Sequence, residues 1–204
     1  LHTSTSSFIH NDIHITEYIH PSLPSSWTLE YENIKKNLLA LIPLNNSYYN
    51  AIDIYAWNDT IEDPYIGIQG GAYISIKNGD DKHKVFVMEI PNNEFTYNSM
   101  HRFSVIAHEY FHCYQMSLNS NMNKYDSHPT SFKTKWLIEG TAASFESLYI
   151  QQYYNKNYFL EAQTAVHSDV IDNPSIFESY DSAEKDINYS SSTFMALALV
   201  KELQ

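Results

Sequence analysis

One segment with helical spacing, residues 104–115 (SVIAHEYFHCYQ), carries histidine and glutamate side chains between apolar residues. His108 and His112 are four residues apart, so on a helix both imidazoles lie on one face and can bind a single ion. Glu109 lies beside them, where its carboxylate can take a proton from a metal-activated water. The spacing therefore predicts a buried helix that supplies two metal ligands and a general base.

A third metal ligand is needed, and the candidate is Glu139 in the segment KWLIEGTAASFESLY. Two histidines and one glutamate leave an open coordination position for water, which is typical of catalytic rather than structural zinc. Taken alone, Glu139 is also explained as a solvated helix residue or as an acid in the N-terminal turn of a helix. Its neighbours favour the ligand interpretation.

The segments VIAHEYFHCYQ and WLIEGTAASFE together resemble the gluzincin zinc metallopeptidases, and the second is similar to the W-L-x-E-G-x-A-x-x-F-E pattern of aminopeptidase N-like enzymes. The matching motifs cover roughly residues 104–149. The resemblance implies a zincin (thermolysin-like) catalytic domain with one Zn²⁺ per chain. It also implies His108, His112 and Glu139 as ligands, Glu109 as general base and acid, and Glu146 as a carboxylate that supports the site or the structure.

The same resemblance extends weakly to INYSSSTFMALALVKEL, which is similar to the tyrosine-led helix of these peptidases. Tyr189 would then donate a hydrogen bond to the oxyanion of the tetrahedral intermediate. Tyr180 and His167 are competing candidates, because the chain holds 17 tyrosines and thermolysin-like enzymes use a histidine for related work. Spacing does not choose among the three.

A substrate-binding strand is the first of two interpretations of GIQGGAYISI. Gly70, Gly71 and Ala72 would allow an extended peptide to approach the edge of the sheet. A plain strand with a bulge at the glycine pair explains the same letters equally well. The segment lacks the carboxylate with which aminopeptidase N-like enzymes bind the substrate amine, so the resemblance does not extend to amino-terminal specificity.

Two other departures from the family lie near the second motif. Ala143 stands where thermolysin-like enzymes have an acid that orients a zinc histidine, so another group must orient that imidazole here. Residues 119–135 are longer than the usual connection and predict an inserted loop, whose Asp126 and His128 we interpret as surface residues.

Hydrophobic periodicity predicts an α+β fold, with strands first and helices after Tyr97. We expect an exposed strand over residues 9–20 after a Ser/Thr-rich tail, and a packing helix through residues 31–42 with Ser26 or Thr28 as its N-cap. Further strands over residues 50–58, 67–81 and 84–90 predict a sheet of three to five strands. Residues 1–204 would form one catalytic domain, with a β-rich lobe (1–96) and a helical lobe with the zinc site (97–204); the resemblance leaves room for a further C-terminal helical domain.

The composition excludes several classes of function. With 24 acidic and 12 basic residues the net charge is −12, which argues against nucleic acid and anionic membranes as partners. The longest apolar stretch, residues 195–200, is far shorter than the roughly 18–20 residues of a membrane span.

Cys113 is the only cysteine, so an intrachain disulfide is impossible, and we expect a buried thiol that does not bind zinc. His10, His14 and His20 alternate along the first strand and are interpreted as half-solvated surface residues.

These patterns favour a zinc-dependent metallopeptidase acting on a peptide or protein substrate. The alternatives are a noncatalytic peptide-binding module that retains the zincin scaffold, and a zinc hydrolase acting on a bond other than a peptide. The start at Leu1 and the habits of the family lead us to expect an extracytoplasmic or secreted protein. Cleavage specificity, endo- or exo-action and oligomeric state stay open.

Overall fold

The computed structural model describes residues 3–119, 134–163, 165–180 and 185–204. The chain divides into two compact units, residues 1–125 and 126–204, which are described separately. The fold is α+β with a mixed five-stranded sheet, as the periodicity predicts. A single catalytic domain with lobes of 1–96 and 97–204 stays a prediction.

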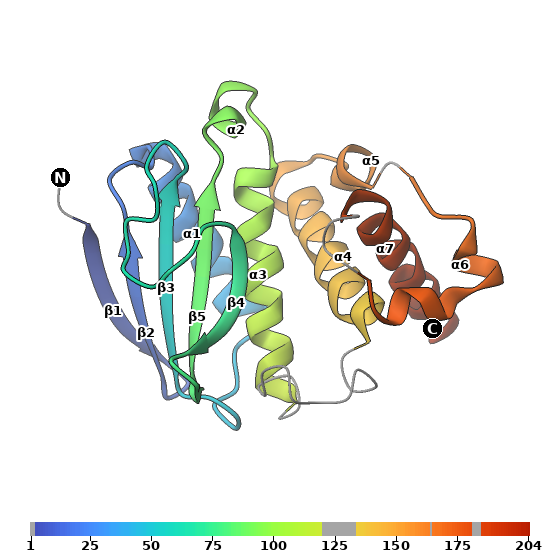
Figure 1. The fold of residues 1–204 in the computed structure, drawn as a ribbon, viewed down its shortest axis with the longest axis horizontal. Helices are drawn as coiled ribbons and strands as arrows, with labels where there is room; N and C mark the ends of the chain where they lie inside the picture. Colours follow the sequence, from blue (N-terminus) through green and yellow to red (C-terminus); the bar gives the residue numbers. More distant parts are fainter. Residues whose placement is uncertain (1–2, 120–133, 164, 181–184) are drawn as a thin grey trace. The chain divides into compact units, whose positions relative to one another are not determined.

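The first unit is built on this sheet, whose strands lie in the order β1-β2-β3-β5-β4 (Figure 1). The three central strands β2, β3 and β5 are parallel, and each edge strand is antiparallel to its neighbour. The strands are β1 (Ser4–His10), β2 (Ile13–Ile19), β3 (Ala51–Asn58), β4 (Ala72–Lys77) and β5 (Asp80–Ile90). The predicted number of strands, three to five, is confirmed.

The N-terminal segment is a β-hairpin, so the prediction of one exposed strand over residues 9–20 is wrong. Asn11 and Asp12 have φ angles of 48° and 61°, which reverse the chain between β1 and β2. The Ser/Thr-rich tail therefore forms the edge strand β1. Strand β2 is not exposed, because its isoleucines Ile13, Ile15 and Ile19 are buried.

A second hairpin joins β4 to β5 through Asn78 and Gly79, which have φ angles of 51° and 79°. A side chain added at Gly79 would meet only open space, and the turn is exposed to solvent. The register of this hairpin shifts between Ile76 and Lys77. The predicted bulge at the glycine pair before β4 is therefore wrong, because the irregularity lies at the other end of the strand.

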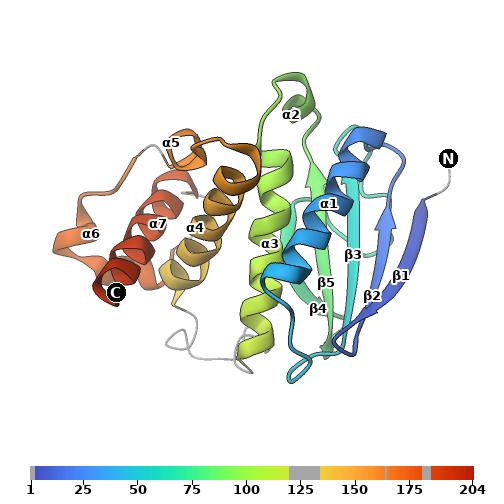
Figure 2. The same cartoon turned by 180° about the vertical axis from the view of Figure 1, so that it is seen from behind.

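Two helices of the first unit, α1 (Ser25–Leu41) and α3 (His101–Leu118), cover one face of the sheet (Figure 2). The short helix α2 (Asn92–Thr96) precedes α3. Helix α1 begins directly after Pro24 and has no side-chain cap, so the predicted cap by Ser26 or Thr28 is wrong. Pro24 occupies the N-cap position and has no side-chain acceptor for the first N–H groups of the helix.

Three aromatic side chains fix α3 to its surroundings by hydrogen bonds. Trp27 Nε1 donates to the carbonyl of Arg102 at 2.8 Å, and the Tyr110 hydroxyl donates to the carbonyl of Ile42 at 2.9 Å. The Tyr49 hydroxyl donates to the carbonyl of Cys113 at 2.7 Å. Hydrogen bonds at Arg102, Tyr110 and Cys113, together with its buried apolar face, leave α3 little freedom to shift.

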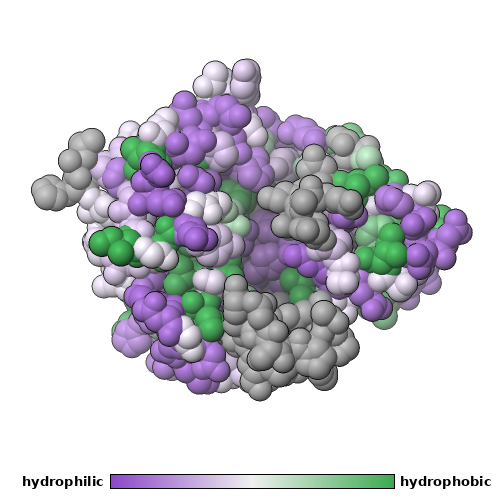
Figure 3. Space-filling view, in the orientation of Figure 1, coloured by the Kyte–Doolittle hydropathy of each residue, from purple (hydrophilic) through white to green (hydrophobic). Residues whose placement is uncertain are grey.

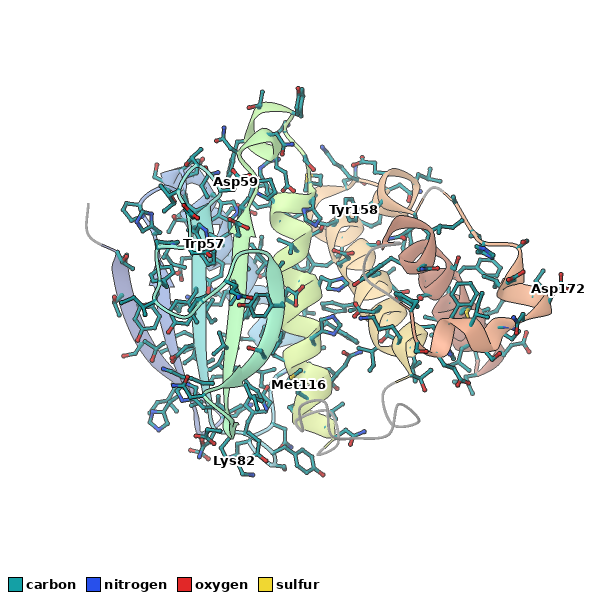
Figure 4. All side chains as sticks on the ribbon, in the orientation of Figure 1. Trp57, Asp59, Lys82, Met116, Tyr158 and Asp172 are labelled. Atoms are coloured by element: carbon teal, nitrogen blue, oxygen red, sulfur yellow. The ribbon has the colours of Figure 1, made fainter. Side chains whose placement is uncertain are left out.

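The opposite face of the sheet carries a smaller core around Trp57, which Figure 4 labels on β3. Trp57 and the neighbouring Val85 and Val87 are buried under side chains of residues 59–71, including Tyr65. Figure 3 shows hydrophilic and hydrophobic residues mixed over this side of the unit. None of the described helices has both the length and the apolar composition that a membrane crossing requires.

The second unit is a set of helices in which α4 (Lys135–Tyr154) packs along α7 (Lys185–Glu202). Small residues line this contact, and Gly140 allows the closest approach. A Cβ atom built at Gly140 would lie 2.1 Å from the Ser192 carbonyl oxygen of α7. The remaining elements are α5 (Tyr158–Ala162), α6 (Asp169–Asp172) and the 3₁₀ helix η3 (Pro174–Glu178).

Gly140→Ala should destabilise the protein by about 1–3 kcal/mol, because the added methyl group collides with the α7 backbone. In an exposed helix the same substitution would stabilise by about 1 kcal/mol, so the sign itself tests the packing. Urea unfolding measures the difference, with the exposed Gln151→Ala on the same helix as the control. A Gly140→Ala protein as stable as wild type would contradict this close approach.

Lys84 is a fully buried cation within the first unit. Its Nζ donates to the Asp81 carbonyl at 2.8 Å and lies 5.7 Å from the centre of the Tyr49 ring. Burial lowers the pKa of Lys84 to about 8, against a smaller opposing effect of Asp81. Between pH 8 and its usual value of 10.5 the unfolded chain holds a proton that the folded chain has released. The free energy of unfolding therefore rises with pH across this window.

Lys84→Met should raise the free energy of unfolding at pH 7 by about 1–3 kcal/mol, because no buried charge has to be desolvated. It should also flatten the rise in stability between pH 8 and 10.5. Urea unfolding across this range measures both effects, with Lys82→Met at a neighbouring exposed position as the control. Equal pH dependence in the two variants would refute the assignment to Lys84.

Candidate metal centre

The two histidines of the H-E-x-x-H pattern lie on α3, as the sequence predicts. Both His108 and His112 are half-buried, and their rings are edge to face with centroids 4.8 Å apart. Their Nε2 atoms lie 3.1 Å from each other. Two imidazole nitrogens, one helical turn apart on α3, thus point toward the same place.

This separation fits a single tetrahedral ion. Zinc binds imidazole nitrogen at about 2.0–2.1 Å, so two nitrogens on one tetrahedral zinc lie about 3.3 Å apart. The observed 3.1 Å between the Nε2 atoms needs only a small adjustment of the rings. The pair can therefore act as two ligands of one metal without a change in the backbone of α3.

Gln115 orients the ring of His112, a role that the sequence analysis did not assign to any residue. The Gln115 Oε1 atom lies 2.8 Å from His112 Nδ1. An amide oxygen is an acceptor, so this contact favours the tautomer with the proton on Nδ1 and leaves Nε2 as the electron-pair donor. Gln115 thus supplies one orienting contact to the His112 ring. The i, i+3 spacing is the only signal in the sequence.

Glu109 is buried on α3, with 6% of its surface exposed. Burial raises the pKa of the Cys113 thiol, and the negative charge of the Glu109 carboxylate raises it further. Cys113 is therefore a neutral thiol, and it is buried as expected; that it does not bind zinc stays a prediction. The role of Glu109 as a proton carrier stays a prediction.

Glu139 belongs to the second unit, on the first turns of α4. Its carboxylate is buried, and Oε1 lies 3.4 Å from the ammonium nitrogen of Lys135. His108, His112 and Glu139 form a group that could hold a metal ion. Glu146 is also buried on α4, with 7% exposed, and its supporting role stays a prediction.

The three candidates for oxyanion stabilisation all lie in the second unit. Tyr180 and Tyr189 pack edge to face with ring centroids 5.9 Å apart. The Tyr180 hydroxyl accepts a hydrogen bond from Ser192 Oγ at 3.1 Å. Burial raises the pKa of Tyr180, as does the Glu139 charge to a smaller extent, so the phenol stays protonated. His167 instead accepts a hydrogen bond at Nδ1 from the Asp169 backbone N–H at 3.1 Å, which holds the start of α6.

The predicted substrate residues lie where β4 begins. Gly70 and Gly71 precede the strand, and Ala72 is its first residue. The Gly71 N–H donates to Glu89 Oε2 at 2.9 Å, and a Cβ atom at Gly70 would touch the same carboxylate. Their role in binding a substrate stays a prediction. Asp126 and His128 of the predicted loop lie outside the described residues.

The fold and the site therefore define a class of protein: an α+β protein with a His/His/Glu group that could hold a metal ion. No protein-family model matches the chain, and no curated protein matches it. Among solved structures, the chain is similar to the crystal structure of an aminopeptidase N family protein from Idiomarina loihiensis, with 13% sequence identity and a TM-score of 0.46. The match covers 97% of this chain and 36% of that protein.

Gln115→Leu should weaken zinc binding by about 10-fold or more, because the His112 ring loses the acceptor that fixes its tautomer. Competition with a chromogenic chelator measures the affinity. Gln115→Glu keeps an acceptor at the same place and should bind zinc more tightly than the leucine variant. Wild-type affinity in the leucine variant would show that the amide contributes nothing to the site.

Proposed function

We propose that the chain is a zinc-dependent metallopeptidase of the gluzincin type, with a thermolysin-like catalytic fold. The observation that carries the proposal is the pair of Nε2 atoms on α3, 3.1 Å apart, with the buried carboxylate of Glu109 next to them in the sequence. Glu139 is the proposed third ligand. A group of this kind could hold a metal ion, and its donors are those that catalytic zinc prefers.

In the proposed reaction a bound zinc ion supplies Lewis acidity, which polarises the scissile carbonyl and acidifies water. Glu109 accepts the proton of the attacking water and passes it to the leaving amine. A tyrosine hydroxyl donates a hydrogen bond to the developing oxyanion. The sequence favours Tyr189 for this step; Tyr180, whose hydroxyl is held by Ser192 Oγ at 3.1 Å, and His167 are the alternatives.

The proposed substrate is an extended peptide or a segment of a protein. Among the described strands β4 pairs only with β5, so its other edge is available for a further strand. Gly70, Gly71 and Ala72 stand at the start of this strand, where small residues permit close approach of a second backbone. Main-chain pairing of this kind would hold a peptide without demanding a particular sequence.

Glu109→Gln should abolish peptide hydrolysis and leave zinc affinity near the wild-type value, because the amide cannot take up the proton but does not disturb the ligands. His112→Ala should lose both peptide hydrolysis and zinc binding, since it removes a ligand. Cleavage of a quenched fluorescent peptide library reports turnover, and elemental analysis reports the metal.

Full peptidase activity of the Glu109→Gln protein would contradict the proposed mechanism. A protein that binds about one zinc per chain yet cleaves no peptide, with or without the substitution, would instead favour a noncatalytic peptide-binding module. Elemental analysis of Glu139→Ala completes the set, since loss of zinc there identifies the third ligand.

A further inference from the structure

A lysine contacts the proposed carboxylate ligand in the second unit. Lys135 and Glu139 are one turn apart on α4, with Nζ 3.4 Å from Oε1. The Glu139 side chain is 11% exposed and the Lys135 side chain 33%. A buried carboxylate therefore has a cation within ion-pair distance at one of its two oxygens.

Helix stability does not explain a lysine at this place. Lys135 is the first residue of α4, where the positive end of the helix dipole disfavours cations by about 0.3–1 kcal/mol. The order lysine then glutamate is also the weaker orientation for an ion pair four residues apart. An ion pair exposed to this degree contributes about 0–1 kcal/mol. A contribution to helix stability therefore does not account for the contact between this lysine and the buried carboxylate.

Neighbouring groups hold the ammonium in place. Lys135 Nζ lies 5.6 Å from the centre of the Tyr180 ring, a cation–π arrangement. Tyr180 is in turn fixed by the hydrogen bond from Ser192 Oγ, which is fully buried on α7. The close contact of α4 with α7 at Gly140 sets the distance between these groups. The Lys135 ammonium thus has a defined position next to the Glu139 carboxylate, although part of the lysine side chain is exposed.

We propose that Lys135 is a positioning residue of the metal site, which holds one carboxylate oxygen of Glu139 so that the other is presented to zinc. The inference rests on the proposed function, because it assigns Glu139 to the metal. Metal-ligating carboxylates are commonly held by such outer contacts, and their loss lowers metal affinity by about 10–100-fold. Holding one oxygen also favours monodentate binding, which keeps a coordination position open for water.

The test is zinc affinity of the full chain, measured by competition with a chromogenic chelator after removal of bound metal. K135M should bind zinc about 10–100-fold more weakly than wild type, with its thermal unfolding little changed. K135R keeps the charge and should bind more tightly than K135M. K201M, on the last turn of α7 and exposed, is the matched control and should bind as wild type does.

The outcomes separate this inference from the proposed function. If E139A weakens zinc binding but K135M binds as tightly as wild type or more tightly, Lys135 does not position the ligand, and the proposed function stands. If wild type and E139A both fail to bind zinc, both proposals fall. K135Q serves the same comparison should K135M fail to fold.

Discussion

Helix α3 can carry two ligands because its own position is fixed along its whole length. Its apolar face is buried against the sheet and α1. Trp27 and Tyr49 donate hydrogen bonds to the α3 carbonyls of Arg102 and Cys113, and Tyr110 of α3 donates to the carbonyl of Ile42 after α1. With the backbone fixed, the 3.1 Å separation of the two Nε2 atoms depends only on side-chain rotation, which Gln115 restrains for His112. The proposed chemistry depends on this rigidity.

The sequence predicts the local parts of the site well, because they depend on helical spacing alone. His108, Glu109 and His112 lie on one helix as expected, and Glu139 lies near the start of a second helix. Gln115 and Lys135 escaped prediction because glutamines and lysines are common on helix surfaces. What distinguishes them is a rotamer and a buried partner, and neither follows from residue type.

The fold was predicted to the level of class and strand number but not of strand order. Residues Ser4–His10 lack the apolar alternation of a strand, since β1 lies at the edge and is largely exposed. The turn at Asn11 and Asp12 carries no glycine, so a chain reversal was harder to recognise there. The parallel pairing of β2 with β3 and of β3 with β5 joins segments that are distant in sequence. Local periodicity holds no information on such neighbours.

The turn at Asn78 and Gly79 has a practical value that comes from its isolation. Both residues are exposed, no other atom lies near Gly79, and the turn is at the far end of β4 from Gly70 and Gly71; the positive φ of Gly79 makes Asn78 the better point of attachment. Exposed loop tips of this kind tolerate inserted residues better than any other backbone. A fluorophore or an affinity handle attached here would allow the protein to be immobilised or followed in solution from the end of β4 opposite to Gly70 and Gly71.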